Sequence, residues 1–435
     1  MSDTAQDERH VGVQARSESR SYRWYVLGVL MLTYAFSFMD RQILSILLED
    51  IRAEFTLTDT QLGLLSGIAF ALFYATLGVP IARLADRMNR VKIVSIAVAV
   101  WSVMTALCGA AGSFVQLFAA RIGVGIGEAG GGPPSHSIIS DYFRKEERGF
   151  AISVYSLGPA LGMLVGLAAG GYIAQHYGWR WAFVCAGVPG VLLALLVRTT
   201  LREPARGALD AEHASDASDG SFGHAIAVLF RNRVYLWTNI GHSAAVFVGY
   251  GFASWKPSLY LRQFDLSQSE VGAIIGVMGI VASLPGLLAG GLIADRLAKH
   301  DARWPGFFCA GAVLVVIPFY VLGLMAADWR IATGLFGLGL FCYQLSHGPG
   351  LAIVQSAVAP NQRALAASFV FMFANILGLG LGPLIVGAIS DSASDAFAER
   401  SLAVALGVCL IALLVAGVGY ARAGVMLGRR DGSRD

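Results

Sequence analysis

The chain has 435 residues, of which 56% are hydrophobic and 14% are charged, and its mean hydropathy is +0.62. A soluble domain has about 25% charged residues, so this chain has too few charges to cover a surface exposed to water. Its net charge of +3 is small and no Lys/Arg-rich tract is present, which argues against a nucleic-acid-binding protein.

The apolar residues come in long blocks, and a helix needs roughly 20 of them to cross the hydrocarbon core of a bilayer. Residues 1–22 are polar, without a signal-peptide pattern, and are predicted to form a cytoplasmic tail. The predicted spans that follow are 24–50, 60–84, 92–112, 115–141, 148–175, 181–200, 235–260, 268–293, 304–326, 330–357, 364–391 and 399–422. We therefore predict an all-α membrane protein with two six-helix bundles, 23–200 and 235–422, joined by a cytoplasmic linker, 201–234, and followed by a cytoplasmic tail, 423–435.

The basic residues predict the orientation of these spans. Arg and Lys gather before the first span, after the second, fourth, sixth and eighth, and at the end of the chain. The opposite loops are poor in basic residues, and two of them are acidic, with Glu49, Asp50, Glu54 and Asp59 in one and Asp391, Asp395 and Glu399 in the other. Because basic loops stay inside, both termini are predicted to be cytoplasmic, and the lack of a targeting sequence favours a bacterial inner membrane.

The two halves repeat each other. Asp86-Arg87 follows the second span and Asp295-Arg296 follows the eighth, while Arg148 opens the fifth span and Arg363 opens the eleventh. Both offsets are about 210 residues. A repeated six-helix half is typical of secondary transporters, whose substrate site lies between the halves near the midplane of the membrane.

The first repeated segment carries a family resemblance. Residues 82–92 resemble the loop motif G-x3-D-R-x-G-x-R-x of the major facilitator superfamily, with Ala82 and Asn89 in place of two glycines, and residues 291–296 repeat its start. The resemblance implies a transporter with the major facilitator fold that works by alternating access. It also implies a conformational gate, for which the candidates are Asp86, Arg87, Asp295, Arg296, Arg148 and Arg363. The alternative is that these charges only set the topology.

A narrower resemblance extends over nearly the whole chain. Segments 38–41, 121–129, 255–257, 360–363 and 382–391 resemble the spinster branch of that superfamily. This implies a carrier of lysophospholipids or sphingoid phosphates driven by a proton gradient. The eleventh span departs from the branch, because residues 375–380 lack the polar His and Asp expected there.

Charged residues lie inside two predicted spans. Asp40 and Arg41 lie in the first, with Asp40 roughly 24 Å from its start at 1.5 Å per residue. Arg121 and Glu128 lie in the fourth span, two helical turns apart and hence on one face. A charge at the bilayer centre costs roughly 2.5–3.5 kcal/mol on insertion scales. We therefore expect these groups to face a wet cavity or one another.

The adjacent Asp40 and Arg41 point about 100° apart on a helix and cannot share one partner. We expect Asp40 or Glu128 to pair with Arg41 or Arg121 in one conformation and to take up a proton in the other. Arg41 is also a candidate for binding an anionic substrate group, because a guanidinium offers phosphate or carboxylate a fixed fork. The alternative is a static buried ion pair that holds helices together.

Other polar residues are weaker cavity candidates, with helix packing as the alternative for each. They are Asn239 and His242 in the seventh span, Tyr343, Gln344 and His347 in the tenth, and Asn375 in the eleventh. The fifth span contains Gly158, Pro159 and Gly162 in a segment that resembles the antiporter motif of the superfamily. These residues predict close helix packing and favour antiport, with symport as the alternative.

The sequence does not favour an enzyme. Residues 125–130 match G-x-G-x-x-G, but they lie inside a predicted span rather than between a strand and a helix. The five cysteines lack metal-ligand spacing, so neither a catalytic nor a metal site is expected. We predict a monomer that needs no cofactor, uses a proton gradient, and has protons, membrane lipid and an amphipathic small molecule as partners. A carrier of small organic anions or drugs, and a sensor without flux, are the alternatives.

Overall fold

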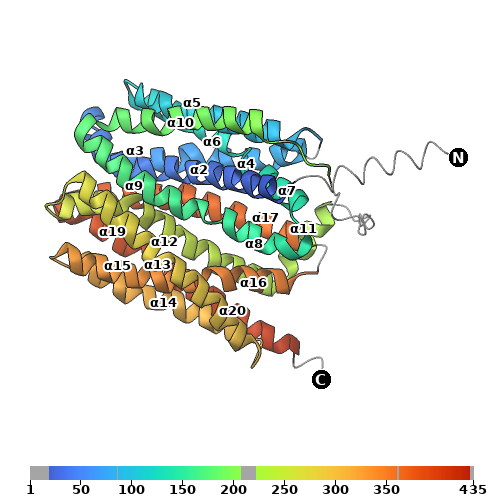
Figure 1. Cartoon of the computed structure of the whole chain (residues 1–435). Coiled ribbons are helices and arrows are strands. Elements are labelled where there is room, and N and C mark those ends of the chain that lie inside the picture. The colour runs from blue at the N-terminus through green and yellow to red at the C-terminus, as the bar shows by residue number, and fades with distance from the viewer. Residues whose placement is uncertain (1–18, 86, 207–221, 360–361, 432–435) are drawn as a thin grey trace. The chain divides into compact units, whose positions relative to one another are not determined.

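The computed structural model describes residues 19–85, 87–206, 222–359 and 362–431, and these residues contain helices and no strand (Figure 1). The helices of the first half are α2 (Arg20–Phe55), α3 (Asp59–Ser66), α4 (Ile68–Ala85), α5 (Arg90–Gly109), α6 (Phe114–Glu128), α7 (Gly132–Tyr142), α8 (Lys145–Tyr155), α9 (Gly158–Tyr177) and α10 (Trp179–Thr200). Those that follow are α11 (Phe222–Arg231), α12 (Arg233–Gln263), α13 (Gln268–Ala298), α14 (Trp304–Met325), α15 (Trp329–Leu345), α16 (His347–Ala357), α17 (Arg363–Phe373), the π-helix η2 (Ala374–Leu381), α18 (Gly382–Phe397), the 3₁₀-helix η3 (Ala398–Arg400), α19 (Ser401–Cys409) and α20 (Ile411–Asp431).

Several helices begin at a side chain that accepts a hydrogen bond from a free backbone amide. The Thr58 hydroxyl accepts from the Gln61 amide at α3, and the Ser267 hydroxyl accepts from the Glu270 amide at α13; both form capping boxes. Asn89 caps α5 through the amide of Lys92. These polar residues fix where a helix begins between long apolar runs.

Seven stretches of the described residues are long and apolar enough to cross a membrane. They are Asp59–Gly78, Arg90–Gly109, Lys145–Tyr177, Trp179–Thr200, Gln268–Ala298, Trp304–Met325 and Leu365–Arg429. They cover eight of the twelve predicted spans and leave out the first, fourth, seventh and tenth. Those four carry every charged or polar candidate in the interior of a predicted span except Asn375. The less apolar spans therefore recur at every third position in both halves.

Two of these polar spans are also broken. The fourth is interrupted between Glu128, the last residue of α6, and Gly132, the first of α7. The tenth is interrupted at Ser346, and α16 begins at His347. In the eleventh span, Asn375 lies in the π-helix η2, a distortion that is frequent at functional sites.

The described chain falls into two compact units. Among the described residues, unit 1 comprises those within 19–42, 73–166 and 180–206, and unit 2 comprises those within 43–72, 167–179 and 222–431. The boundaries pass through α2, α4 and α9 and after the first residue of α10, so they differ from the bundles 23–200 and 235–422 predicted from sequence. That division stays a prediction.

In unit 1, small residues let helices approach closely. A Cβ on Gly127 of α6 would lie 2.6 Å from the backbone nitrogen of Trp101 in α5. A Cβ on Gly158 of α9 would lie 2.7 Å from the Met31 carbonyl oxygen in α2, and Gly162 meets the Ala35 carbonyl one turn further on. Gly158 and Gly162 thus lie at a close approach of α9 to α2. Pro159 follows Gly158 within the first turn of α9.

In unit 2, α12 packs along α20, and α14 lies between α15 and α20 (Figure 1). The interior is aromatic: Phe252, Tyr260 and Tyr320 surround Phe336, with ring centroids 5.5–6.2 Å away from its own. Lys256 is 5% exposed beside these rings, with its Nζ 5.5 Å from the Phe336 centroid. Helix α3 packs against α18.

The first part of the predicted linker is held against unit 1 by Arg90, a residue of the loop motif. The Arg90 side chain is 3% exposed and pairs with Asp141 and Glu203. Its Nη2 also donates to the Pro204 carbonyl at 3.0 Å. The linker therefore begins as an ordered segment across the start of α5.

We expect Arg90→Met to reduce the thermal stability of the protein, because it leaves Asp141 and Glu203 without their shared cation. Breaking one side of a buried charge pair costs roughly 3–5 kcal/mol, and the partial exposure of Glu203, 23%, places the effect at the lower end. The melting temperature in detergent measures it. Arg23→Met, which removes a more exposed pair with Glu147, is the control, and an equal shift in both variants would contradict the assignment.

Candidate functional site

The intramembrane charges of unit 1 form two ion pairs that join α2 to α6. Arg41 pairs with Glu128, and Asp40 pairs with Arg121. The two neighbours on α2 therefore bind different partners, as their angular separation requires. The structure thus brings together all four residues that the sequence singles out. Proton coupling by Asp40 and Glu128, and substrate binding by Arg41 or Arg121, stay predictions.

The two oxygens of Glu128 differ in their surroundings. Oε2 accepts hydrogen bonds from Nε and Nη2 of Arg41, at 2.8 and 2.6 Å, and from the Ser37 hydroxyl at 2.6 Å. Oε1 is buried and has no hydrogen-bond partner among the described residues. Because Oε2 already accepts three hydrogen bonds and Oε1 accepts none from the described residues, Oε1 is the oxygen on which this carboxylate can take up a proton.

Arg41 lies between two aromatic rings. Its Cζ is 4.9 Å from the ring centroid of Phe38 and 4.7 Å from that of Tyr74. Cation–π contacts of this kind hold a guanidinium without neutralising it. The Arg41 side chain is 10% exposed, and its charge is directed to Glu128.

Both oxygens of Asp40 have donors. Oδ2 accepts from Nη1 of Arg121 at 2.8 Å, and Oδ1 accepts from the Thr105 hydroxyl of α5 at 2.5 Å. Asp40 and Arg121 are 2% and 1% exposed. This pair is more deeply buried than that of Arg41, and it ties α2, α5 and α6 together.

Four residues of this site escaped the sequence analysis: Ser37, Phe38, Tyr74 and Thr105. Ser37 lies four residues before Arg41, one helical turn, so the spacing could have indicated a shared partner. Phe38, although within a segment that resembles the spinster branch, gave no sign of a cation contact. Nothing in the sequence around Tyr74 or Thr105 indicates which face of its helix meets α2.

The polar candidates of unit 2 include a pair of histidines. The ring centroids of His242 and His347 lie 5.1 Å apart, and that of Tyr343 lies 6.4 Å from His347. The His242 Nδ1 is 3.3 Å from the hydroxyl of Tyr420, which the sequence analysis missed. Asn239 is bound within its own helix by the Ser243 hydroxyl at 3.3 Å, while Gln344 and Asn375 are half-buried.

Most of the predicted gate residues are exposed to solvent. Asp86 lies outside the described residues, and Arg87, Asp295, Arg296 and Arg363 are exposed. Arg148 donates from Nη2 to the Ser140 carbonyl at 2.8 Å, which ties the start of α8 to the end of α7. Their role in gating stays a prediction.

Known proteins resemble the chain over most of its length. A model of the Major Facilitator Superfamily matches residues 30–383. An MFS-type efflux pump of Mycolicibacterium smegmatis is 33% identical over 91% of this chain and 90% of its own length. Protein spinster homolog 1 of Xenopus tropicalis is 27% identical over 91% of this chain and 80% of its own length. The crystal structure of a bacterial homolog to the human lysosomal transporter spinster, inward-facing and unoccupied, has a TM-score of 0.84 at 28% identity, and the match covers 95% of this chain and 99% of that chain.

Proposed function

Because this chain belongs to the Major Facilitator Superfamily, and within it to the spinster branch, we propose that it couples the movement of protons to that of an amphipathic anion. It is an integral membrane transporter with the major facilitator fold, not an enzyme. The anion we propose is a lysophospholipid or a sphingoid phosphate. We place the protein in a bacterial inner membrane as a monomer, with both termini in the cytoplasm.

The observation that carries proton coupling is the arrangement of Glu128. Its Oε2 is saturated by Arg41 and Ser37, and its buried Oε1 has no partner among the described residues. Asp40, in contrast, uses both oxygens. We therefore assign proton uptake to Oε1 of Glu128 and a positioning role to the Asp40–Arg121 pair.

The same geometry links the proton to the anion. A proton on Glu128 removes the negative charge that holds Arg41, while Phe38 and Tyr74 keep the guanidinium in place. Arg41 can then bind a phosphate through its fork of N–H donors. Proton and anion thus favour each other's binding, and such coupling is reciprocal.

This cooperation favours symport, in which both ligands bind the same state. The antiport that residues 158–162 favour would require the proton and the substrate to compete for one site. A substrate with a cationic group that binds the Glu128 carboxylate would compete with the proton in this way. The efflux-pump relative supports a carrier of drugs or small organic anions as the second candidate function.

Transport in proteoliposomes under an imposed pH gradient tests the proposal. We expect an anionic lysolipid to accumulate on the alkaline side, and a gradient of two pH units supports about 100-fold accumulation at a one-to-one ratio. A small carboxylate and a hydrophobic cation are the comparison substrates. Flux of the two comparison substrates, without flux of the lysolipid, would favour the second candidate function. Accumulation of the lysolipid on the acidic side would establish antiport. If none of the substrates moved, a sensor without transport would be the remaining interpretation.

A further inference from the structure

The carboxyl group of Glu128 is cut off from bulk water in this conformation. Its Oε1 is buried, and the residue as a whole is 3% exposed. A proton that binds there has to pass through other groups of the protein. Imidazoles exchange protons near neutral pH, and a hydroxyl both donates and accepts a hydrogen bond, so these are the groups that can supply a route.

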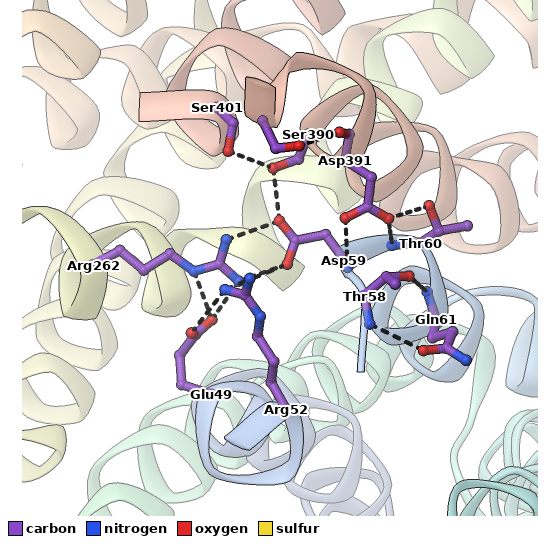
Figure 2. Close-up of polar contacts among 11 residues, drawn as sticks. Glu49, Arg52, Thr58, Asp59, Thr60, Gln61, Arg262, Ser390, Asp391 and Ser401 are labelled. Carbon is purple, nitrogen blue, oxygen red and sulfur yellow. Dashed lines mark hydrogen bonds and ion pairs between the residues drawn. The ribbon is translucent and has the colours of Figure 1, made fainter. Parts of the chain in front are cut away.

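The charged side chains elsewhere in the two units are poorly suited to this task, because many of them are held in ion pairs. In unit 2, Arg262 donates to both oxygens of Asp59, and Asp391 accepts from the Asp59 backbone amide (Figure 2). In unit 1, Asp141 is paired with Arg90. A carboxylate that is bound to a guanidinium or to an amide donor keeps its charge and does not pass protons on.

His136 is a titratable group without such a partner. It is the one histidine among the described residues of unit 1, and its side chain is exposed although it lies within the predicted span 115–141. It is the fifth residue of α7, eight residues after Glu128 and on the side of it that is predicted to face the cytoplasm. Within the described part of the chain, its ring forms neither an ion pair nor a hydrogen bond.

The His136 ring contacts a row of aromatic rings. Its centroid lies 5.0 Å from that of Tyr155, at an interplanar angle of 71°. Tyr155 in turn stacks on Tyr34, with the centroids 4.7 Å apart and an interplanar angle of 9°. The Tyr155 hydroxyl lies within electrostatic range of those of Tyr34 and Tyr74. Since Tyr155 is 2% exposed, the row leads from an exposed imidazole into the interior of unit 1.

This row of rings ends at the helix face that binds Glu128. Tyr34, Ser37 and Arg41 occupy positions i, i+3 and i+7 of α2 and therefore share one face of it. The Ser37 hydroxyl and the Arg41 guanidinium both donate to Glu128. The exposed imidazole and the buried carboxyl are thus joined by hydroxyl groups of α8 and α2.

The other ionisable groups near His136 leave its ring free to take up a proton. Helix α7 packs against α5 and α8, and these helices and the rings beyond them contribute Arg90 of α5, Asp141 of α7 itself, Arg148 and Tyr155 of α8, Tyr34 of α2 and Tyr74 of α4. Asp141 is paired with Arg90, and Arg148 donates to the Ser140 carbonyl. Only hydroxyl groups therefore remain beside the imidazole.

We propose that His136 carries protons between the cytoplasm and Glu128 by way of the hydroxyls of Tyr155 and Tyr34. The imidazole takes a proton from water at one ring nitrogen and releases one from the other, and each hydroxyl accepts a proton as it passes on its own. No group of this relay keeps a net charge, and the proton gradient sets the direction. The relay rests on the proposed function, because it supplies the proton that Glu128 takes up.

Transport kinetics in weakly buffered proteoliposomes test the relay. A proton carrier changes the rate of coupled uptake but not the final accumulation, which the gradient fixes. In His136→Ala we expect the initial rate of proton-driven uptake of the labelled anionic lysolipid to fall by about 100-fold, the lower end of what a positioned proton-transfer group contributes. The final accumulation should equal that of the wild type. Exchange of lysolipid at equal pH, during which Glu128 keeps its proton, should run at the wild-type rate.

Imidazole added to the medium should restore the uptake rate of His136→Ala, because a small buffer replaces the missing proton carrier. Tyr155→Phe keeps the ring that stacks on Tyr34 but loses the hydroxyl. It should also be slow, without a response to imidazole, and it covers the case that His136→Ala does not fold. His300→Gln is the matched control, since His300 is exposed in the turn after α13, and its rate should equal that of the wild type.

Unchanged uptake in His136→Ala, beside a wild type that accumulates lysolipid, would overturn the relay alone. Slow exchange at equal pH would overturn it too, because the damage would then lie in substrate binding or in the movement of the halves. A lost rate that imidazole does not restore would assign His136 to ring packing. A wild type that accumulates no lysolipid would overturn the proposed function and the relay together.

Discussion

Proton-driven accumulation of substrate is expected to disappear in Glu128→Gln. The amide has the shape of the carboxylate and still accepts from Arg41 and Ser37, so the fold should be kept, but it can neither gain nor lose the proton that Oε1 would carry. We expect accumulation under a pH gradient to fall by about 100-fold, to the level reached without a gradient. Substrate binding, in contrast, should persist and become independent of pH, because the charge on Arg41 is no longer neutralised.

Accumulation of labelled substrate in proteoliposomes and binding across a pH series measure the two effects. Glu270→Gln is the matched control, because Glu270 is exposed and only caps α13; it should behave as the wild type. A Glu128→Gln protein that still concentrates substrate in response to a proton gradient would remove Glu128 from the coupling mechanism.

Arg121→Met is expected to have the largest effect on stability. The substitution leaves Asp40 buried with the Thr105 hydroxyl but without its cation, and an unpaired buried charge costs roughly 3–5 kcal/mol. Adding Asp40→Asn removes that charge, so the double variant should recover most of the loss, because replacing both partners of a buried pair is often nearly neutral. The double variant should also keep its pH dependence of transport, since Glu128 is intact.

The melting temperatures of the wild type, Arg121→Met, Asp40→Asn and the double variant form a double-mutant cycle that isolates the pair energy. Additive losses would show that the two side chains do not depend on each other. A stable double variant whose transport no longer responds to pH would assign proton uptake to Asp40, as the sequence alone allows.

The sequence was informative where the bilayer constrains the residue type. Asp40, Arg41, Arg121 and Glu128 could be recognised because ionised groups are rare among apolar residues, and their helical spacing already separated the partners of Asp40 and Arg41. The family followed from local motifs, such as residues 82–92, that the comparisons bear out.

Other parts of the sites depend on contacts between distant helices. The sequence left open which arginine binds which carboxylate, and it gave no sign that Thr105 would reach Asp40 or Tyr74 would cover Arg41. Arg262 and Asp59 are about 200 residues apart in the chain, and each reads there as an ordinary charge at the end of a span. A short-range pattern carries no information on such pairs.

By itself, the sequence determined that the chain crosses a membrane, that it has two related halves and that charges lie buried in the first and fourth spans, because hydrophobic length and the cost of burying a charge are properties of the local chain. Only the tertiary structure decided the pairing of Arg41 with Glu128, the bare Oε1 of that carboxylate and the contact of His136 with Tyr155. These depend on which helix faces meet, and that is set by close packing at residues such as Gly158 and Gly162, whose neighbours lie far away in sequence.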